Sequence, residues 1–566
     1  MRDRCIPYLA VGALAISLNV VQALAAEEEE ATVPVVDETD RARPVDYGPG
    51  PGLPRAVTSS AAQEVAGQAA TLAAEAAVEP AAALPAADAK TKGVFAPAVA
   101  WPIISIHAVL LPDGRVMSYG TNQNGAQTGQ FVYDVWTPTA GTGPGSHNVL
   151  PNTTATDIFC SGQSVMSSYN AAINGQVLMT GGDSHSAAGE RNFSIDKVTM
   201  FNPQSNTIRL LSQTMVYKRW YPSVITLFTG DKLVLGGRED KAPSPAVTPE
   251  LFTKNGAWRV LPGATSAPAF GVDRANWYYP RAVQMPAGNN VFVLAFTGKM
   301  FSLNPVGNGA ITQLPQQTAL SNFTLPTVNF APGKLLSVRT NRQTVVVNLN
   351  SGQPVTTPTA PIGAVRQWSN GTVMADGKVL VTGGSAVGNQ LTGVAYAAET
   401  WDPATGKWTT GDSATKPRLY HSIGLLLPDA SVLTGGGGAP GPIKNLNAEL
   451  YYPPYLYTAA GQPAARPTLV AAPTLLQPKP GTTFTATVGA GDQISRVTLL
   501  RTGSVTHSNN PDQNFQPLGF TQNGQTLTIN APANPYVTVP GYYMLFVFNA
   551  NGVPSVAKIM RVPPAA

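Results

Sequence analysis

The sequence predicts an all-β chain in which a seven-bladed β-propeller is followed by a small β-sandwich. Two observations lead to this fold class. The chain has 566 residues, of which 54 are glycine and 50 are proline, and these punctuate short runs rich in Val, Leu and Thr. Such a pattern is typical of many strands joined by tight turns. In addition, a unit of turn, apolar strand and glycine pair returns about every 40 to 60 residues, the spacing expected of propeller blades.

The repeat unit is clearest at Val177–Gly182, where an Asn174-Gly175 turn leads into an apolar strand that ends in two glycines. Six further copies, two of them degenerate, lie at residues 115–120, 233–237, 291–298, 334–338, 379–384 and 432–436. Kelch-type blades continue with a Trp-Asp-Pro…Gly-Lys-Trp stretch, which Trp401–Trp408 matches. Seven units in register therefore predict a seven-bladed kelch-type propeller over residues 95–465.

The segments on either side of the repeats differ from them in composition. Residues 26–94 are rich in Ala, Glu and Pro and poor in aromatic residues, which predicts a flexible or partly helical linker. Residues 466–566 lack the glycine pairs and contain alternating stretches at 483–488, 497–500, 526–529 and 543–547. About 100 residues of this kind predict a small immunoglobulin-like β-sandwich.

The N-terminus has the pattern of an export signal, which we place at residues 1–25. Arg2 and Arg4 precede the apolar run Ile6–Val21, and Ala23–Ala25 supplies a small-residue cleavage site. The alternative is an uncleaved membrane anchor, for which the apolar run is short. We expect a secreted, periplasmic or cell-surface protein whose mature chain has no membrane span. The small net charge of +4 and the lack of a basic tract argue against nucleic acid as a partner.

Three aromatic residues occupy matching places in different repeats. Tyr221, Trp368 and Tyr420 each lie 15 residues before a repeat glycine; these glycines are Gly236, Gly383 and Gly435. In a propeller, the starts of the innermost strands meet at one end of the central channel. Repeat symmetry therefore predicts that the three rings face one pocket on the axis.

His421 and Cys160 add two groups with metal or redox chemistry. His421 directly follows Tyr420, and neighbours on a regular strand point to opposite faces. Both reach one pocket only if the backbone bends at the start of the strand, which Pro417 favours; otherwise His421 packs between blades. Removal of the signal, with its Cys5, leaves Cys160 as the only cysteine, so it forms no intramolecular disulfide. Its ordinary interpretation is a small buried core residue.

Four segments, followed by a matching tail at residues 540–557, are similar in sequence and in order to those of one known family. The segments are Asp157–Gly162, Arg219–Pro222, Tyr420–Ser422 and Thr506–Gln513. From about residue 95 to the last residue, the chain resembles the galactose oxidase and glyoxal oxidase family of copper radical oxidases. The residues of the second segment resemble those of the glyoxal oxidase branch.

The resemblance implies one copper ion and a redox cofactor made from the chain itself. In this family pattern, Cys160 and Tyr221 form a thioether cross-link, and Tyr221 is an equatorial metal ligand and the seat of the radical. His421 and His507 are the two nitrogen ligands, and His507 arrives on a loop of the last domain that threads the propeller axis. Tyr420 is the axial ligand and the base that takes the substrate hydroxyl proton.

The activity that the resemblance implies is oxidation of primary alcohols or aldehydes by O2, with release of H2O2. The substrate is then a small alcohol, aldehyde or carbohydrate, and the product an aldehyde or carboxylic acid. Imidazole and oxygen ligands suit Cu(II), and a bound dication lowers the pKa of a phenol below its usual value of about 10. Two alternatives stay open: a non-catalytic secreted propeller that binds carbohydrate or protein, and a copper enzyme without the radical.

The sequence departs from the family in one place that concerns the radical. A tryptophan that stacks on the cross-linked tyrosine in galactose oxidase is missing from Gly236–Asp240, and glyoxal oxidases also lack it there. Trp220 and Trp368 are the candidates to shield the ring of Tyr221.

The remaining polar candidates have simpler interpretations. Arg366 either lines the pocket or joins an inter-blade salt bridge of the kind expected also for Arg219 and Arg418, and the second interpretation is favoured. The other histidines are interpreted as structural or surface groups; they are His107, His147 and His185.

Overall fold

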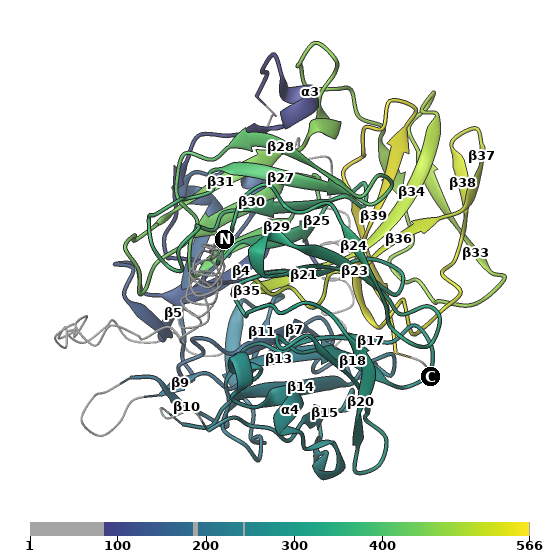
Figure 1. Cartoon of the computed structure of the whole chain (residues 1–566). Helices are drawn as coiled ribbons and strands as arrows, with labels where there is room; N and C mark the ends of the chain where they lie inside the picture. Colours follow the sequence, from purple (N-terminus) through teal and green to yellow (C-terminus); the bar gives the residue numbers. More distant parts are fainter. Residues whose placement is uncertain (1–83, 185–190, 241–243, 565–566) are drawn as a thin grey trace, which may run out of the picture. The chain divides into compact units, whose positions relative to one another are not determined.

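The computed structural model describes residues 84–184, 191–240 and 244–564, and all of them belong to one compact unit of the chain. Strands dominate this part (Figure 1), and its α-helices are the short α3 (Ala89–Lys92) and α4 (Ala267–Phe270). The export signal expected at 1–25, most of the expected linker and His185 lie outside the described residues.

Seven antiparallel sheets within the described ranges form the blades of the propeller, which confirms the predicted fold class. The innermost strands are β3 (His107–Leu110), β7 (Gly162–Val165), β13 (Trp220–Thr226), β17 (Arg281–Gln284), β21 (Thr327–Ala331), β25 (Asn370–Val373) and β29 (Ser422–Leu426). The second strands are β4 (Val116–Thr121), β8 (Val177–Thr180), β14 (Lys232–Arg238), β18 (Val291–Leu294), β22 (Lys334–Val338), β26 (Val379–Thr382) and β30 (Val432–Gly436). Each of the seven sequence repeats thus falls on the second strand of a blade.

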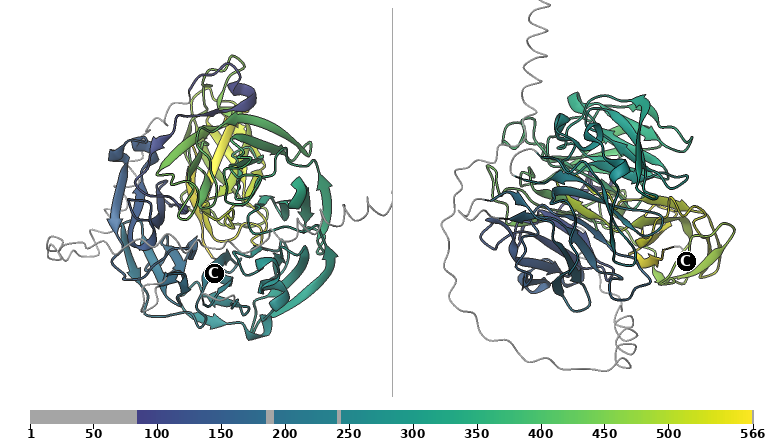
Figure 2. Two further views of the ribbon diagram at one scale, coloured as in Figure 1. Left: turned by 60° about the vertical axis from the view of Figure 1, so that its left-hand side comes forward. Right: turned by 90° about the horizontal axis from the view of Figure 1, so that it is seen from below.

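The outer strands complete the blades in the same order. They are β5 (Gln127–Trp136), β6 (His147–Pro151), β11 (Val198–Asn202), β12 (Thr207–Leu210), β15 (Glu250–Phe252), β16 (Trp258–Val260), β19 (Lys299–Asn304), β20 (Ala310–Gln317), β23 (Thr344–Asn348), β24 (Val355–Thr359), β27 (Ala397–Asp402), β28 (Lys407–Ser413) and β31 (Asn447–Tyr452). Between blades, innermost strands contact one another, for example β7 with β13 and β25 with β29. The blades form a ring in Figure 2, left.

The repeat glycines have a packing reason that explains the pattern in the sequence. Gly181 adopts φ +71°, and a Cβ there would lie 2.1 Å from the carbonyl oxygen of Arg219 in the next blade. The following residue, Gly182, donates its N–H to that same carbonyl at 3.0 Å. Only a residue without a side chain permits this close approach and this conformation. In this blade, the glycine pair therefore joins the second strand to the next blade.

Distant segments complete the first and last blades. β1 (Val94–Phe95) and β2 (Val99–Ala100) pair with β31, so residues near the start of the described chain supply outer strands to the last blade. β35 (Ser504–Thr506) pairs with β3 on the axis side of the first blade, with His107 opposite Thr506. The last domain therefore adds a strand to the propeller itself.

Two four-stranded sheets form the C-terminal β-sandwich, as predicted. Their strands are β32 (Leu469–Ala471), β33 (Thr483–Val488), β34 (Ile494–Arg501), β36 (Phe515–Leu518), β37 (Phe520–Asn523), β38 (Thr526–Asn530), β39 (Gly541–Asn549) and β40 (Lys558–Val562). Alternating apolar residues, including Val488, Leu499, Leu527 and Leu545, form its buried core. Among the described helices, none is long and apolar enough to span a bilayer.

Candidate active site

Left-handed backbone conformations mark the start of several innermost strands. Residues with positive φ stand at or just before the start of these strands in five blades: Cys160 (56°), Tyr221 (68°), Tyr279 (41°), Trp368 (66°) and His421 (67°). This conformation is uncommon for residues other than glycine and is strained for bulky ones. The N–H of Tyr221 bonds the carbonyl of Cys160 and that of Tyr279 bonds the carbonyl of Tyr221, both at 2.9 Å. The strained turns are thus linked from blade to blade around the axis.

The turn at His421 lets two neighbouring side chains enter one cluster. The rings of Tyr420 and His421 stack with centroids 3.6 Å apart, and both are buried. The left-handed φ of His421 breaks the alternation expected of a strand. His421 therefore does not pack between blades; its ring lies 4.6 Å from that of His507.

In the blade that carries Tyr420, one more residue separates the buried arginine from the left-handed residue than in the blades of Tyr221 and Trp368. Arg219 bonds the carbonyl of Gly236 and Arg366 that of Gly383, whereas Arg418 bonds that of Gly436. The sequence alignment of Tyr420 on Gly435 is therefore wrong by one residue. In the strand register, His421, and not Tyr420, corresponds to Tyr221, because Ser422 pairs with Gly436 as Pro222 pairs with Gly236.

The predicted side chains converge on the axis. The hydroxyls of Tyr221 and Tyr420 are 2.9 Å apart, and Cys160 Sγ lies 3.4 Å from Nε2 of His507. Nδ1 of His421 bonds the carbonyl of Gly438 at 2.8 Å. Its Nε2 is buried and has no hydrogen-bond partner among the described residues. The structure thus brings all five predicted site residues together, although they come from four segments of the chain.

His507 reaches the cluster from the C-terminal domain through a tight turn. It follows β35 directly, and His507 and Ser508 have φ of 48° and 59°. Backbone hydrogen bonds in both directions between Thr506 and Asn509 close this turn. Beyond it, Asn509 donates to the hydroxyl of Ser223 at 3.2 Å. The loop is therefore tied to the inner strands on both sides of His507.

Burial keeps the titratable groups of the cluster neutral. It lowers the pKa of His421 to about 3 and that of His507 well below its usual value, so both imidazoles offer a lone pair at neutral pH. It raises the pKa of Tyr221 above its usual value. It also raises the pKa of the Cys160 thiol, which hydrogen bonding from Tyr221 opposes. Neutral imidazoles are the form that binds metal, and a cation would favour loss of the phenol protons.

The donor set fits a copper(II) ion. A buried imidazole nitrogen without a hydrogen-bond partner costs free energy. A cation bound at Nε2 of His421 would remove this cost. Two phenol oxygens and a second imidazole lie beside it, from Tyr221, Tyr420 and His507. Nitrogen and oxygen ligands of this kind suit Cu(II), whereas softer metal ions prefer thiolate ligands.

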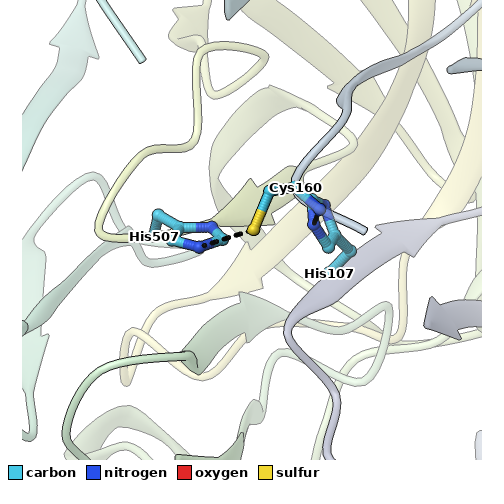
Figure 3. Close-up of side chains that lie close together, drawn as sticks. All are labelled: His107, Cys160 and His507. Carbon is cyan, nitrogen blue, oxygen red and sulfur yellow. Dashed lines mark hydrogen bonds between the residues drawn. The ribbon is translucent and has the colours of Figure 1, made fainter. Parts of the chain in front are cut away.

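His107, interpreted from the sequence as a structural or surface group, lies buried in the same cluster. Nε2 of His107 accepts the backbone N–H of Cys160 at 3.1 Å, and its ring stacks on Tyr119 at 4.3 Å. Figure 3 shows His107, Cys160 and His507 together, and their potential ligand atoms lie within 4.8 Å of one another. His107 supports the turn at Cys160. His147, by contrast, is a structural group, since it bonds Asp134 at 2.7 Å.

Two aromatic rings flank Tyr221. Trp220, one of the two residues expected to shield this ring, packs on it with a centroid distance of 4.2 Å. Trp368 instead contacts Tyr420, at 4.3 Å, and so is not the principal shield. The second partner is Tyr278, stacked at 4.2 Å and 29°, whose hydroxyl also donates to that of Tyr420 at 3.3 Å.

Tyr278 is absent from the sequence prediction, although a signal for it exists. The words Trp277-Tyr278-Tyr279-Pro280 and Trp220-Tyr221-Pro222 are alike. The blade that starts with β17 has no glycine pair to reveal the match, because its repeat is degenerate.

Arg366 is a structural residue. It forms a buried salt bridge with Glu399 at 2.7 Å. Arg219 pairs with Glu250 and Arg418 with Glu449 in the same way. Each acid stands on the third strand of the same blade, so these bridges lie within blades and not between them as expected.

Comparison with known proteins agrees with this fold. Residues 466–562 match the family described as galactose oxidase-like, early set domain. A galactose oxidase of Gibberella zeae is 26% identical over 526 residues, covering 83% of this chain and 70% of the relative. The aldehyde oxidase GLOX1 of Arabidopsis thaliana is 26% identical over 485 residues, covering 73% of each.

A solved structure shares the fold. It is described as a novel fungal alcohol oxidase with catalytic diversity among the AA5 family, in complex with copper. It is 24% identical to this chain, with a TM-score of 0.71, and covers 83% of this chain and 99% of its own.

Proposed function

This chain is a relative of the galactose oxidase and glyoxal oxidase family, and from that premise we propose that it is a secreted copper radical oxidase. One observation carries the proposal: Tyr221, Tyr420, His421, His507 and Cys160 meet in one buried cluster with a free imidazole nitrogen. These residue types are required together by copper radical chemistry and by no simpler function of a propeller.

Within the proposal, the five residues hold the metal and form the redox cofactor. Tyr221, Tyr420, His421 and His507 hold the metal, and Cys160 joins Tyr221 through a thioether. Copper supplies one one-electron acceptor when bound, and the oxidised Cys160–Tyr221 side chain supplies the second. A thioether makes the phenolate of Tyr221 easier to oxidise than that of an ordinary tyrosine.

Tyr420 acts as the base for the substrate. Its hydroxyl lies beside that of Tyr221, and it takes the proton of the substrate hydroxyl. Conversion of a primary alcohol to an aldehyde removes two electrons and two protons, and O2 accepts both pairs to give H2O2. An aldehyde substrate reacts as its hydrate and yields a carboxylic acid with the same balance. The aromatic rings of Trp220 and Tyr278 pack on the oxidised ring and exclude water from it.

The domain organisation and location follow the same proposal. Residues 1–25 direct export, residues 95–465 form the propeller, and residues 466–566 form the domain that supplies His507. The N-terminal pattern of charge, apolar run and small residues supports export.

The experiment that tests the function is copper loading under air, followed by intact mass and denaturing gel electrophoresis. We expect a loss of about two hydrogens, the mass change of thioether formation. The matched control, Cys160→Ser, should bind copper without this change. A peroxide-coupled screen of alcohols and aldehydes then identifies the substrate. A free thiol and an unchanged mass in the copper-bound wild type would leave the alternative, a binding propeller or a simpler copper protein.

A further inference from the structure

Arg238 is a nearly buried cation beside the cluster. It is the last residue of β14 and pairs across the hairpin with Trp220, at the same end of the blade as Tyr221. Only 8% of its surface is exposed. Its guanidinium lies 4.2 Å from the ring centroid of Trp220 and 5.7 Å from that of Trp277. One positive charge therefore faces two indoles.

Both indoles also lie close to the ring of Tyr221. The centroid of Trp220 is 4.2 Å from that of Tyr221, and the centroid of Trp277 is 6.1 Å away. Both tryptophans are fully buried. At such distances an oxidised Tyr221 can take an electron from either indole, which would carry the oxidising equivalent away from the substrate.

A cation over an indole face opposes that transfer. It attracts the filled π-system of the neutral ring and repels the positive charge that would form on it. Both effects are strong where water is excluded. The guanidinium lies 4.2 Å from the ring centroid of Trp220, and Trp220 in turn packs on Tyr221. The charge therefore acts more directly on the indole than on the phenol, and raises the oxidation potential of the indole more.

We propose that Arg238 confines the oxidising equivalent to Tyr221 by making Trp220 and Trp277 harder to oxidise. The inference rests on the proposed radical function. The step that Arg238 suppresses is the transfer of one electron from an indole to the oxidised Tyr221, which restores the phenolate and leaves an indole radical cation. That radical cation loses its N–H proton, and O2, the oxidant of the proposed reaction, adds to the resulting neutral indole radical to form a peroxyl radical, which leaves oxygen bound to the ring. Arg238 is accordingly a positioning residue that acts through Trp220.

The test compares Arg238→Gln with a matched control in copper-loaded, cross-linked protein. Arg496 supplies the control, since its guanidinium lies 4.1 Å from the ring of Phe548 in the sandwich, and Arg496→Gln removes a similar cation–π contact there. Each protein is oxidised with a one-electron chemical oxidant without substrate. The lifetime of the oxidised form is followed by its absorption, and oxygen addition to tryptophan is located by peptide mass spectrometry.

We expect Arg238→Gln to shorten the lifetime about tenfold and to add oxygen to Trp220. Arg496→Gln should behave as wild type. Arg238→Lys keeps a charge and should retain most of the lifetime. Trp220→Phe in the Arg238→Gln background should restore it, because phenylalanine is much harder to oxidise.

An unchanged lifetime in Arg238→Gln, with its cross-link formed and no oxygen on Trp220 or Trp277, would overturn the inference alone. Loss of lifetime that Trp220→Phe does not restore would also overturn it, since the residue would then act through structure. If wild type forms neither cross-link nor oxidised species, the proposed function fails and the inference fails with it.

Discussion

Replacement of Lys232 by methionine should change how the stability of the protein depends on pH. The amine of Lys232 is fully buried and donates to Ser164 Oγ at 2.9 Å, to the carbonyl of Val165 at 2.8 Å and to Thr226 Oγ1 at 2.7 Å. Ser164 Oγ also bonds Asp512, which belongs to the loop that follows His507. Lys232 thus anchors the segment that delivers a proposed ligand.

The sign of the effect follows from the direction of the pKa shift. Burial first, and then the charge of Arg501, lower the pKa of Lys232 to about 7 in the folded protein, against about 10.4 in the unfolded chain. The folded state binds fewer protons than the unfolded state between these two values. The penalty for burying the charge is therefore fully present below about pH 7 and disappears as the pH rises to about 10.4.

The magnitude comes from the same two values. Each pKa unit corresponds to about 1.4 kcal/mol, so the full penalty is about 5 kcal/mol. Between about pH 6 and pH 9, the free energy of unfolding of the wild type should rise by about 3 kcal/mol relative to that of Lys232→Met. The three lost hydrogen bonds lower the stability of the variant by an amount that is nearly independent of pH.

Urea unfolding of the metal-free proteins at several pH values measures this difference. Lys378→Met is the control, because Lys378 is 42% exposed and its salt bridge, to Asp402, lies outside the buried core. A wild-type minus Lys232→Met difference that is the same at about pH 6 and about pH 9 would refute the reasoning.

Three further predictions concern the site and the blades. His421→Ala should weaken Cu(II) binding at least about 100-fold while the far-UV circular dichroism stays unchanged, as isothermal titration would measure; equal affinity would remove His421 from the ligand set. Glu399→Gln should lower the free energy of unfolding by about 3 kcal/mol, because Arg366 loses its charged partner in the interior. Its KM for substrate should stay unchanged, and a large rise in KM would show that Arg366 binds substrate. Tyr278→Leu should shorten the lifetime of the oxidised cofactor, whereas Tyr278→Phe, which keeps the stacked ring, should retain it; equal lifetimes would exclude stacking as the cause.

The repeats made part of the site predictable from sequence. Tyr221 and Trp368 share a register, and repeat symmetry alone places both at the axis. The same reasoning failed by one residue at Tyr420, because four consecutive glycines, Gly435–Gly438, conceal which of them corresponds to the pair in other blades. The backbone turn at His421 was expected from Pro417, but the residue that bends is His421 itself.

Other features depend on contacts that local patterns do not encode. The pairing of β35 with β3 joins Thr506 to His107, almost 400 residues apart in sequence, and no periodicity indicates it. Likewise, His107 carries no motif, and its role at Cys160 follows from the blade geometry. Side-chain partners such as Arg238 and Trp220 depend on the cross-strand register of β13 and β14, which the sequence pattern alone does not fix.

β35, the strand that the last domain adds to the first blade, has a consequence for the order of folding during biosynthesis. Until residues 504–506 are made and docked, β3 presents an unpaired strand edge toward an empty axis, and such an edge invites pairing with other chains. His507, the proposed ligand, follows that strand directly, so a nascent propeller lacks one member of the proposed metal-binding set. A chain cut short before this point would be prone to aggregation and would lack the proposed ligand His507.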